Sequence, residues 1–169
     1  EERNSGTLEL LLTLPVSRTE IILGKFLAAW LFSGLALILT FPLWISVNYL
    51  GDPDNGVIFA SYIGSWLMAG GFLSIGSCMS ALTRSQVVAF VLCGFITLLF
   101  VMAGFPLVLD VFRGWVPLLI LDAITSLSFL THYNSITKGV LSLNDFLYFI
   151  SIIVAWLFAT AIAIESKKS

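Results

Sequence analysis

The residues of this chain that could do chemistry are few and lie far apart. The sequence contains one histidine, His132, and an adjacent pair of glutamates, Glu1 and Glu2. A metal site needs three or four converging ligands, and intramembrane proteases that use paired glutamates carry them on a membrane-spanning helix beside histidines. His132 could sense pH or contact a metal on its own, but a hydrogen-bonded histidine at an interface explains it better. We therefore expect no catalytic residue and no metal site.

Motifs for nucleotide binding and hydrolysis are missing from the sequence. It contains no GxxxxGK[ST] phosphate loop, no HExxH, no paired-cysteine motif and no GxSxG elbow. ATP therefore cannot bind to this chain through a phosphate loop. Cys78 and Cys93 fit best as small packing residues. These observations favour a non-catalytic protein that binds no cofactor directly.

The composition is that of an integral membrane protein. Hydrophobic residues make up 59% of the 169 residues, charged residues 11%, and the mean hydropathy is +1.03. The net charge is -2 and the basic residues are scattered, so nothing indicates nucleic-acid binding.

Four apolar segments are about as long as the roughly 20 residues that cross a bilayer. We expect spanning helices at 17–50, 57–82, 87–109 and 146–164. In the second of these, small residues recur every four positions in two series and predict a close helix-packing seam: Ala60 and Gly64, then Gly70, Ser74 and Cys78.

The segment 110–145 between the last two spans is expected to lie at the outer surface. Its apolar part, 115–130, is short and carries Pro117 and Asp122, and a carboxylate at bilayer depth is costly. With four spans, six of the eight Lys and Arg residues fall on the cytoplasmic side, against five if this part crossed fully. We therefore predict an outer re-entrant or interfacial segment, with both ends of the chain in the cytoplasm.

The first twenty residues combine charges with leucines and turn signals. Gly6 and Pro15 bound a short helix at 6–14, and Ser17-Arg18-Thr19-Glu20 fits a capping box that starts the next helix. Such a helix can dock on a partner through its leucines, or it can lie in the lipid interface.

Two motifs resemble the permeases of ABC-2 type exporters. The pattern E-x-x-x-GT-x-E-x-L-x-x-x-P-x-x-R, followed by G-K, is met by these residues: Glu2, Gly6, Thr7, Glu9, Leu11, Pro15, Arg18, Gly24 and Lys25. Near the other end, H-[FY]-x-S-x-x-[KR]-G-V-[IL] and then D-x-x-Y-F resemble the gliding-motility and copper-processing branch of the family. That motif runs from His132 to Asp145, Tyr148 and Phe149.

The resemblance implies an all-α integral membrane fold: the last four of six spanning helices, a cytoplasmic coupling helix and an outer re-entrant segment. The chain would then be one permease domain, 1–169, whose N-terminal part is missing. The implied ATPase-coupling residues are Glu2, Gly6, Thr7, Glu9, Leu10, Leu11, Pro15, Ser17 and Arg18. The implied residues of the outer segment are Asp122, His132, Tyr133, Lys138 and Gly139.

The partners implied are ABC ATPase subunits, which bind ATP and Mg, a second permease copy and membrane lipid, in the cell or inner membrane. The expected function is that of a permease subunit that couples ATP hydrolysis in the ATPase to export. The alternative is a membrane scaffold that transmits ATPase motion without transport. The substrate cannot be identified from the sequence.

Overall fold

The computed structural model describes residues 18–112, 115–139 and 142–166, and in this part of the chain the regular structure is all helical. The helices are α2 (Arg18–Leu39), α3 (Phe41–Leu50), α4 (Asn55–Leu82), α5 (Gln86–Met102), α6 (Pro106–Phe112), α7 (Leu118–Ser126), α8 (Phe129–Thr137) and α9 (Leu143–Ser166). The all-α fold expected from the sequence is confirmed.

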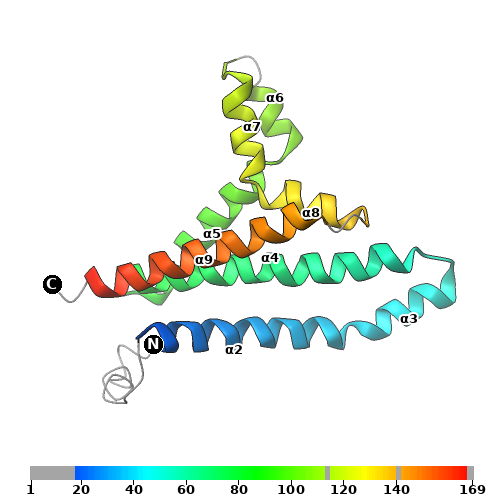
Figure 1. Cartoon of the computed structure of the whole chain (residues 1–169), viewed down its shortest axis with the longest axis horizontal. Coiled ribbons are helices and arrows are strands. Elements are labelled where there is room, and N and C mark those ends of the chain that lie inside the picture. The colour runs from blue at the N-terminus through cyan, green and yellow to red at the C-terminus, as the bar shows by residue number, and fades with distance from the viewer. Residues whose placement is uncertain (1–17, 113–114, 140–141, 167–169) are drawn as a thin grey trace.

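The long helix α4 is the centre of the bundle. It packs against α9, α5, α8 and α2, and Figure 1 shows α2, α4 and α9 running side by side while α6 and α7 stand away from them. The buried core follows α4 and its neighbours α8 and α9, and consists of Ala60, Leu67, Ile75, Cys78, Met79, Phe129, Ile136 and Phe149.

Small residues on α4 let the neighbouring helices approach closely. All five positions of the predicted packing seam are buried: Ala60, Gly64, Gly70, Ser74 and Cys78. A β-carbon at Gly64 would lie 2.9 Å from a methyl carbon of Ile136, and one at Gly71 would lie 3.1 Å from the ring of Phe129. In lipid, where apolar surface alone does not drive association, such close packing holds helices together.

Two tryptophans join α2 to α4. Trp30 Nε1 donates to the carbonyl oxygen of Trp66 at 2.9 Å, and Trp66 Nε1 donates to the carbonyl oxygen of Trp30 at 3.0 Å. The rings stack with centroids 4.5 Å apart. This reciprocal pair satisfies both indole N–H groups in the apolar interior and fixes the position of α2 along α4.

The first expected span is divided at Thr40. Helix α3 has Pro42 in its first turn, where a missing N–H is tolerated, and the whole of Thr19–Leu50 remains long and apolar enough to cross a bilayer. At the start of α4, Asp54 caps the helix by accepting from Gly56 N–H at 2.9 Å.

The third expected span, 87–109, is not one continuous helix. Helix α5 ends at Met102, and α6 turns away from it by 74°. Pro106 disfavours helical backbone at Phe105, and Gly104 lies so close to α8 that a β-carbon there would be 2.3 Å from Ser128 Oγ. The described chain thus has three helices able to span a membrane, or four if this bent pair is one span.

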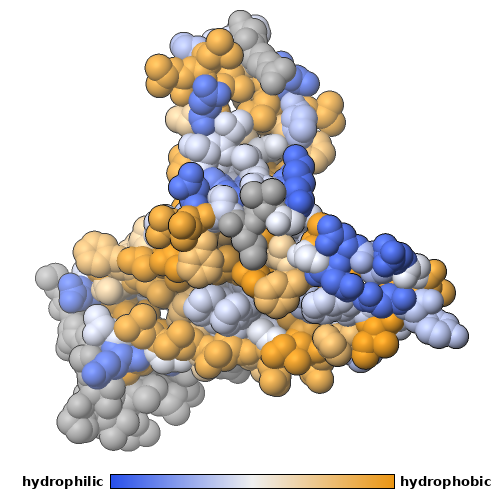
Figure 2. Space-filling view, turned by 45° about the vertical axis from the view of Figure 1, so that its right-hand side comes forward, coloured by the Kyte–Doolittle hydropathy of each residue, from blue (hydrophilic) through white to orange (hydrophobic). Residues whose placement is uncertain are grey.

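Large apolar side chains cover much of the outside. Leu31, Phe32, Leu39 and Phe90 are each more than 60% exposed, and Figure 2 shows apolar surface over much of the bundle and of the α6–α7 arm. Such a surface fits contact with lipid or with other membrane helices.

Candidate functional site

The predicted ATPase-coupling residues lie outside the described part of the chain. This holds for Glu2, Gly6, Thr7, Glu9, Leu10, Leu11, Pro15 and Ser17, and for the side chain of Arg18, whose backbone begins α2. Their role stays a prediction. The structure does describe the helix into which they lead.

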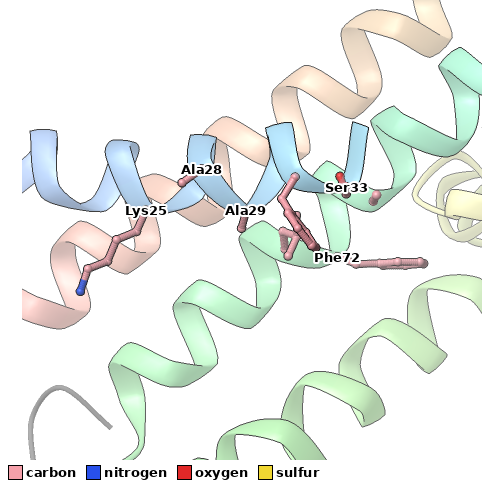
Figure 3. A pocket seen from close by; sticks show the side chains of 8 residues that line it. Lys25, Ala28, Ala29, Ser33 and Phe72 are labelled. Carbon is pink, nitrogen blue, oxygen red and sulfur yellow. The ribbon is translucent and has the colours of Figure 1, made fainter. Parts of the chain in front are cut away.

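A shallow groove runs between α2 and α4, a few residues into α2. It has a volume of about 720 Å³ and is lined by Lys25, Ala28, Ala29, Phe32, Ser33, Ala69, Phe72 and Leu73. Figure 3 shows Lys25 at one end of this groove and Ser33 toward the other. The lining is almost entirely apolar, so the groove can accept an aliphatic or aromatic group, with an amine near one end.

The segment 110–145, predicted to lie at the outer surface, is anchored to the bundle by α8. Ser128 caps this helix by accepting from Leu130 N–H at 3.1 Å, and the next residue, Phe129, is fully buried. Its ring packs against four other aromatic rings, those of Phe72, Phe100, Tyr148 and Phe149. On the same helix, Tyr133 shares a hydrogen bond of 3.2 Å with Ser65 of α4.

A polar cluster joins the ends of α7, α8 and α9. We call it the outer clasp: the carbonyl groups of Ser126 and Leu127, and the side chains of His132, Ser142, Asp145 and Tyr148. Asp145 Oδ1 lies 2.6 Å from His132 Nδ1, and Ser142 Oγ donates to Asp145 Oδ2 at 2.9 Å. Asp145 is 5% exposed, so both of its oxygens are held by protein groups at the start of α9, where a carboxylate favours the helix dipole.

Both ring nitrogens of His132 face hydrogen-bond acceptors. Nδ1 faces the Asp145 carboxylate, and Nε2 lies 2.9 Å from the carbonyl oxygen of Ser126. A carbonyl oxygen only accepts, so Nε2 carries a hydrogen, and the bond at Nδ1 needs a second one on the ring or on the carboxyl group. When both contacts are hydrogen bonds, His132 and Asp145 together hold one proton more than a neutral imidazole beside a carboxylate.

Tyr148 completes the outer clasp. Its ring stacks on the imidazole of His132 with centroids 3.8 Å apart, and its hydroxyl donates to the carbonyl oxygen of Leu127. The carbonyl groups of Ser126 and Leu127 end α7, where no helical N–H remains to pair with them. Two side chains, one from α8 and one from α9, thus complete the end of α7.

The other predicted residues of the outer segment are less closely engaged. Gly139 follows α8 with φ of +82°, a left-handed backbone that glycine adopts without strain. The side chains of Asp122 and Lys138 are exposed. Asp145 and Tyr148 were part of the motif that begins at His132, but nothing in their spacing indicated that they contact its ring.

The chain is similar to known membrane permeases. A sequence model for ABC-2 family transporter proteins matches residues 1–166. Over 85 residues the chain is 33% identical to the probable multidrug ABC transporter permease YbhS of Escherichia coli strain K12, and equally to its counterpart in strain O157:H7. Each match covers 50% of this chain and 22% of the relative, so the chain spans only a fraction of the length of these proteins.

Proposed function

We propose that this chain, which belongs to the ABC-2 family of transporter proteins, is the permease of an exporter that a separate ATPase subunit drives. The observation that carries this proposal is the family match over residues 1–166, which includes the expected coupling helix. ATP and Mg would be bound by the ATPase partner, and the chain itself would be non-catalytic. Both ends of the chain would lie in the cytoplasm, with the protein in the cell or inner membrane.

Packed helices of the bundle can transmit a movement of the coupling segment. That segment leads directly into α2, which the Trp30–Trp66 pair ties to α4. Helix α4 in turn packs on α5, α8 and α9. A displacement of α2 along its axis would therefore move the central helix of the bundle with it.

A hydrophobic substrate fits the described surfaces best. Helices α4 and α5 contain no Asp, Glu, Lys or Arg, and the groove beside α2 is almost wholly apolar. The E. coli relative is named a probable multidrug permease, and many drugs are hydrophobic or amphipathic. The broad apolar exterior would be covered by lipid and by a second copy of the permease.

The test uses the full-length permease reconstituted in lipid vesicles with its ATPase partner. Glu9→Gln and Leu11→Ala are expected to lower permease-stimulated ATP hydrolysis about tenfold, because losing an interface charge or truncating an interface leucine costs on the order of 1–2 kcal/mol. Glu165→Gln is the matched control: it removes the same charge from an exposed position at the end of α9, and hydrolysis should stay at the wild-type level.

Movement of a hydrophobic fluorescent dye across the same vesicles separates the two functions that the sequence leaves open. Dye export that stops in both coupling variants supports the permease. Stimulated hydrolysis without dye movement in the unchanged protein would favour a scaffold that transmits force. Wild-type hydrolysis in Glu9→Gln and Leu11→Ala would refute the coupling role.

A further inference from the structure

The outer clasp contains a proton that its hydrogen bonds require. We propose that it is a proton-sensitive latch: with the proton present, His132 holds the end of α7 to the start of α9, and loss of the proton releases α7. This regulatory role rests on the proposed transport function, because the latch would set the position of the outer segment during export.

Loss of the proton breaks one particular contact. A neutral imidazole has a single N–H, and the Asp145 carboxylate, at 2.6 Å, is a stronger acceptor than a carbonyl group. The N–H therefore stays on Nδ1, and the lone pair of Nε2 then faces the carbonyl oxygen of Ser126 at 2.9 Å. That contact turns from attractive to repulsive. If the extra proton sat on Asp145 instead, its removal would leave the same single N–H for two acceptors.

The surroundings of His132 favour the cationic ring. Tyr148 presents the face of its ring at a centroid distance of 3.8 Å, an arrangement that attracts a cation. Asp145 of α9 is the charged side chain that contacts the imidazole. Helices α4 and α5, which pack on α8, carry no Asp, Glu, Lys or Arg, and the other described charged residues on α6, α7 and the end of α8, namely Asp110, Asp122 and Lys138, are exposed.

Helix α7 has few other attachments. It packs chiefly on α8, and Leu121 is its one buried residue. Figure 1 shows α6 and α7 standing away from the long helices, joined to them near α8. The hydrogen bonds to Ser126 and Leu127 are therefore a large part of what fixes the direction of this arm, and losing the Ser126 bond leaves the Tyr148 bond to Leu127 as the remaining one of the two.

The direction of the pH response follows from proton linkage. The engaged arrangement needs the extra proton and the released arrangement does not, so acidity favours engagement. Raising the pH through the range in which histidine ordinarily changes charge should therefore lower the ratio of engaged to released protein.

Pulsed electron paramagnetic resonance of the full-length protein in lipid vesicles measures this directly. Spin labels at Leu119 of α7 and Leu147 of α9, both exposed, report the distance between the two helices in a background with Cys78 and Cys93 changed to alanine. We expect a narrow distance distribution at about pH 5 and a broader or displaced one at about pH 8. A distribution that does not change with pH would overturn the latch.

Variants separate the latch from a general effect of pH. Asp145→Asn should abolish the pH response, whereas Asp122→Asn, which removes the same charge from an exposed position on α7, should keep it. His132→Gln should give the released distribution at both pH values. A pH response that persists in His132→Gln would refute the proposal.

Nuclear magnetic resonance of the His132 ring tests the latch in protein whose outer clasp is unchanged. In protein labelled with ¹⁵N-histidine, Nε2 of His132 should carry a hydrogen in acid and lose it as the pH is raised. An Nε2 that keeps its hydrogen throughout the pH range would contradict the latch. Neither spectroscopic readout uses ATPase or substrate. A protein that responds to pH but exports nothing would thus overturn the transport function and leave the latch standing.

Discussion

Replacing Gly70 with alanine tests the junction on which the proposed transmission depends. Gly70 lies on α4 where α2 and α9 meet it: a β-carbon there would be 2.8 Å from Trp30 Nε1 and 2.9 Å from Ile153 Cδ1. The isoleucine methyl can rotate away. The Trp30 ring cannot move freely, because it is stacked on Trp66 and its Nε1 donates to the Trp66 carbonyl group.

The expected loss of stability in Gly70→Ala is the sum of three contributions. Overpacking of a tight site costs about 1–3 kcal/mol. Weakening the Trp30 hydrogen bond adds about 0.6 kcal/mol, the average for such bonds between membrane helices. Alanine regains up to about 1 kcal/mol of helix propensity. With the full gain in helix propensity, the free energy of unfolding should therefore fall by about 0.6–2.6 kcal/mol, roughly a 3- to 80-fold change in the folded-to-unfolded ratio.

Gly94→Ala is the matched control, since it makes the same chemical change in the middle of α5 with no atom within 4 Å of the new β-carbon. It should leave stability unchanged or raise it by up to about 1 kcal/mol. Reversible unfolding in lipid–detergent mixtures, followed by tryptophan fluorescence, compares the two variants. Equal stabilities would refute the tight α2–α4–α9 junction.

Two further predictions concern the same assay. Trp30→Phe and Trp66→Phe should each cost about 0.6 kcal/mol, and the double variant should cost less than their sum because both changes disrupt one stacked pair; strict additivity would contradict the reciprocal arrangement. Gly139→Ala should cost about 1–2 kcal/mol, because φ is +82° there, and Gly139→Asn should cost less, since asparagine tolerates this backbone better; equal losses would show that the left-handed turn does not set the cost.

The helical membrane fold was readable from the sequence because its signals are local. Apolar runs of the right length predict spanning helices, and the spacing of Gly64, Gly70 and Cys78 predicted the face of α4 that is buried. Both signals act within one helix. They can be interpreted without knowing which helix packs against the small residues of α4.

The end of α5 and the outer clasp depend on contacts between distant segments. An apolar run through 87–109 looked continuous, although Gly104 and Pro106 mark the break at which the chain turns by 74°. The bond between His132 and Asp145 arises because α8 folds back along α9, and the bond between His132 and Ser126 because α7 ends beside them. Residue types predicted a hydrogen-bonded histidine at an interface, but only the packing shows that acceptors face both ring nitrogens.

Helices α2 and α8 contact adjacent positions of α4. Gly70 meets Trp30 of α2, and Gly71 meets Phe129 of α8. Successive residues of a helix point about 100° apart, so two neighbours can be packed at one level without contacting each other. A shift of α2 would reach α8, which carries His132, through the backbone of α4 and through α9, which contacts both helices. The outer clasp would therefore respond both to movement of the coupling segment and to pH. If so, an enlarged side chain at Gly71 should alter the pH response of α7 while leaving the Trp30–Trp66 pair intact.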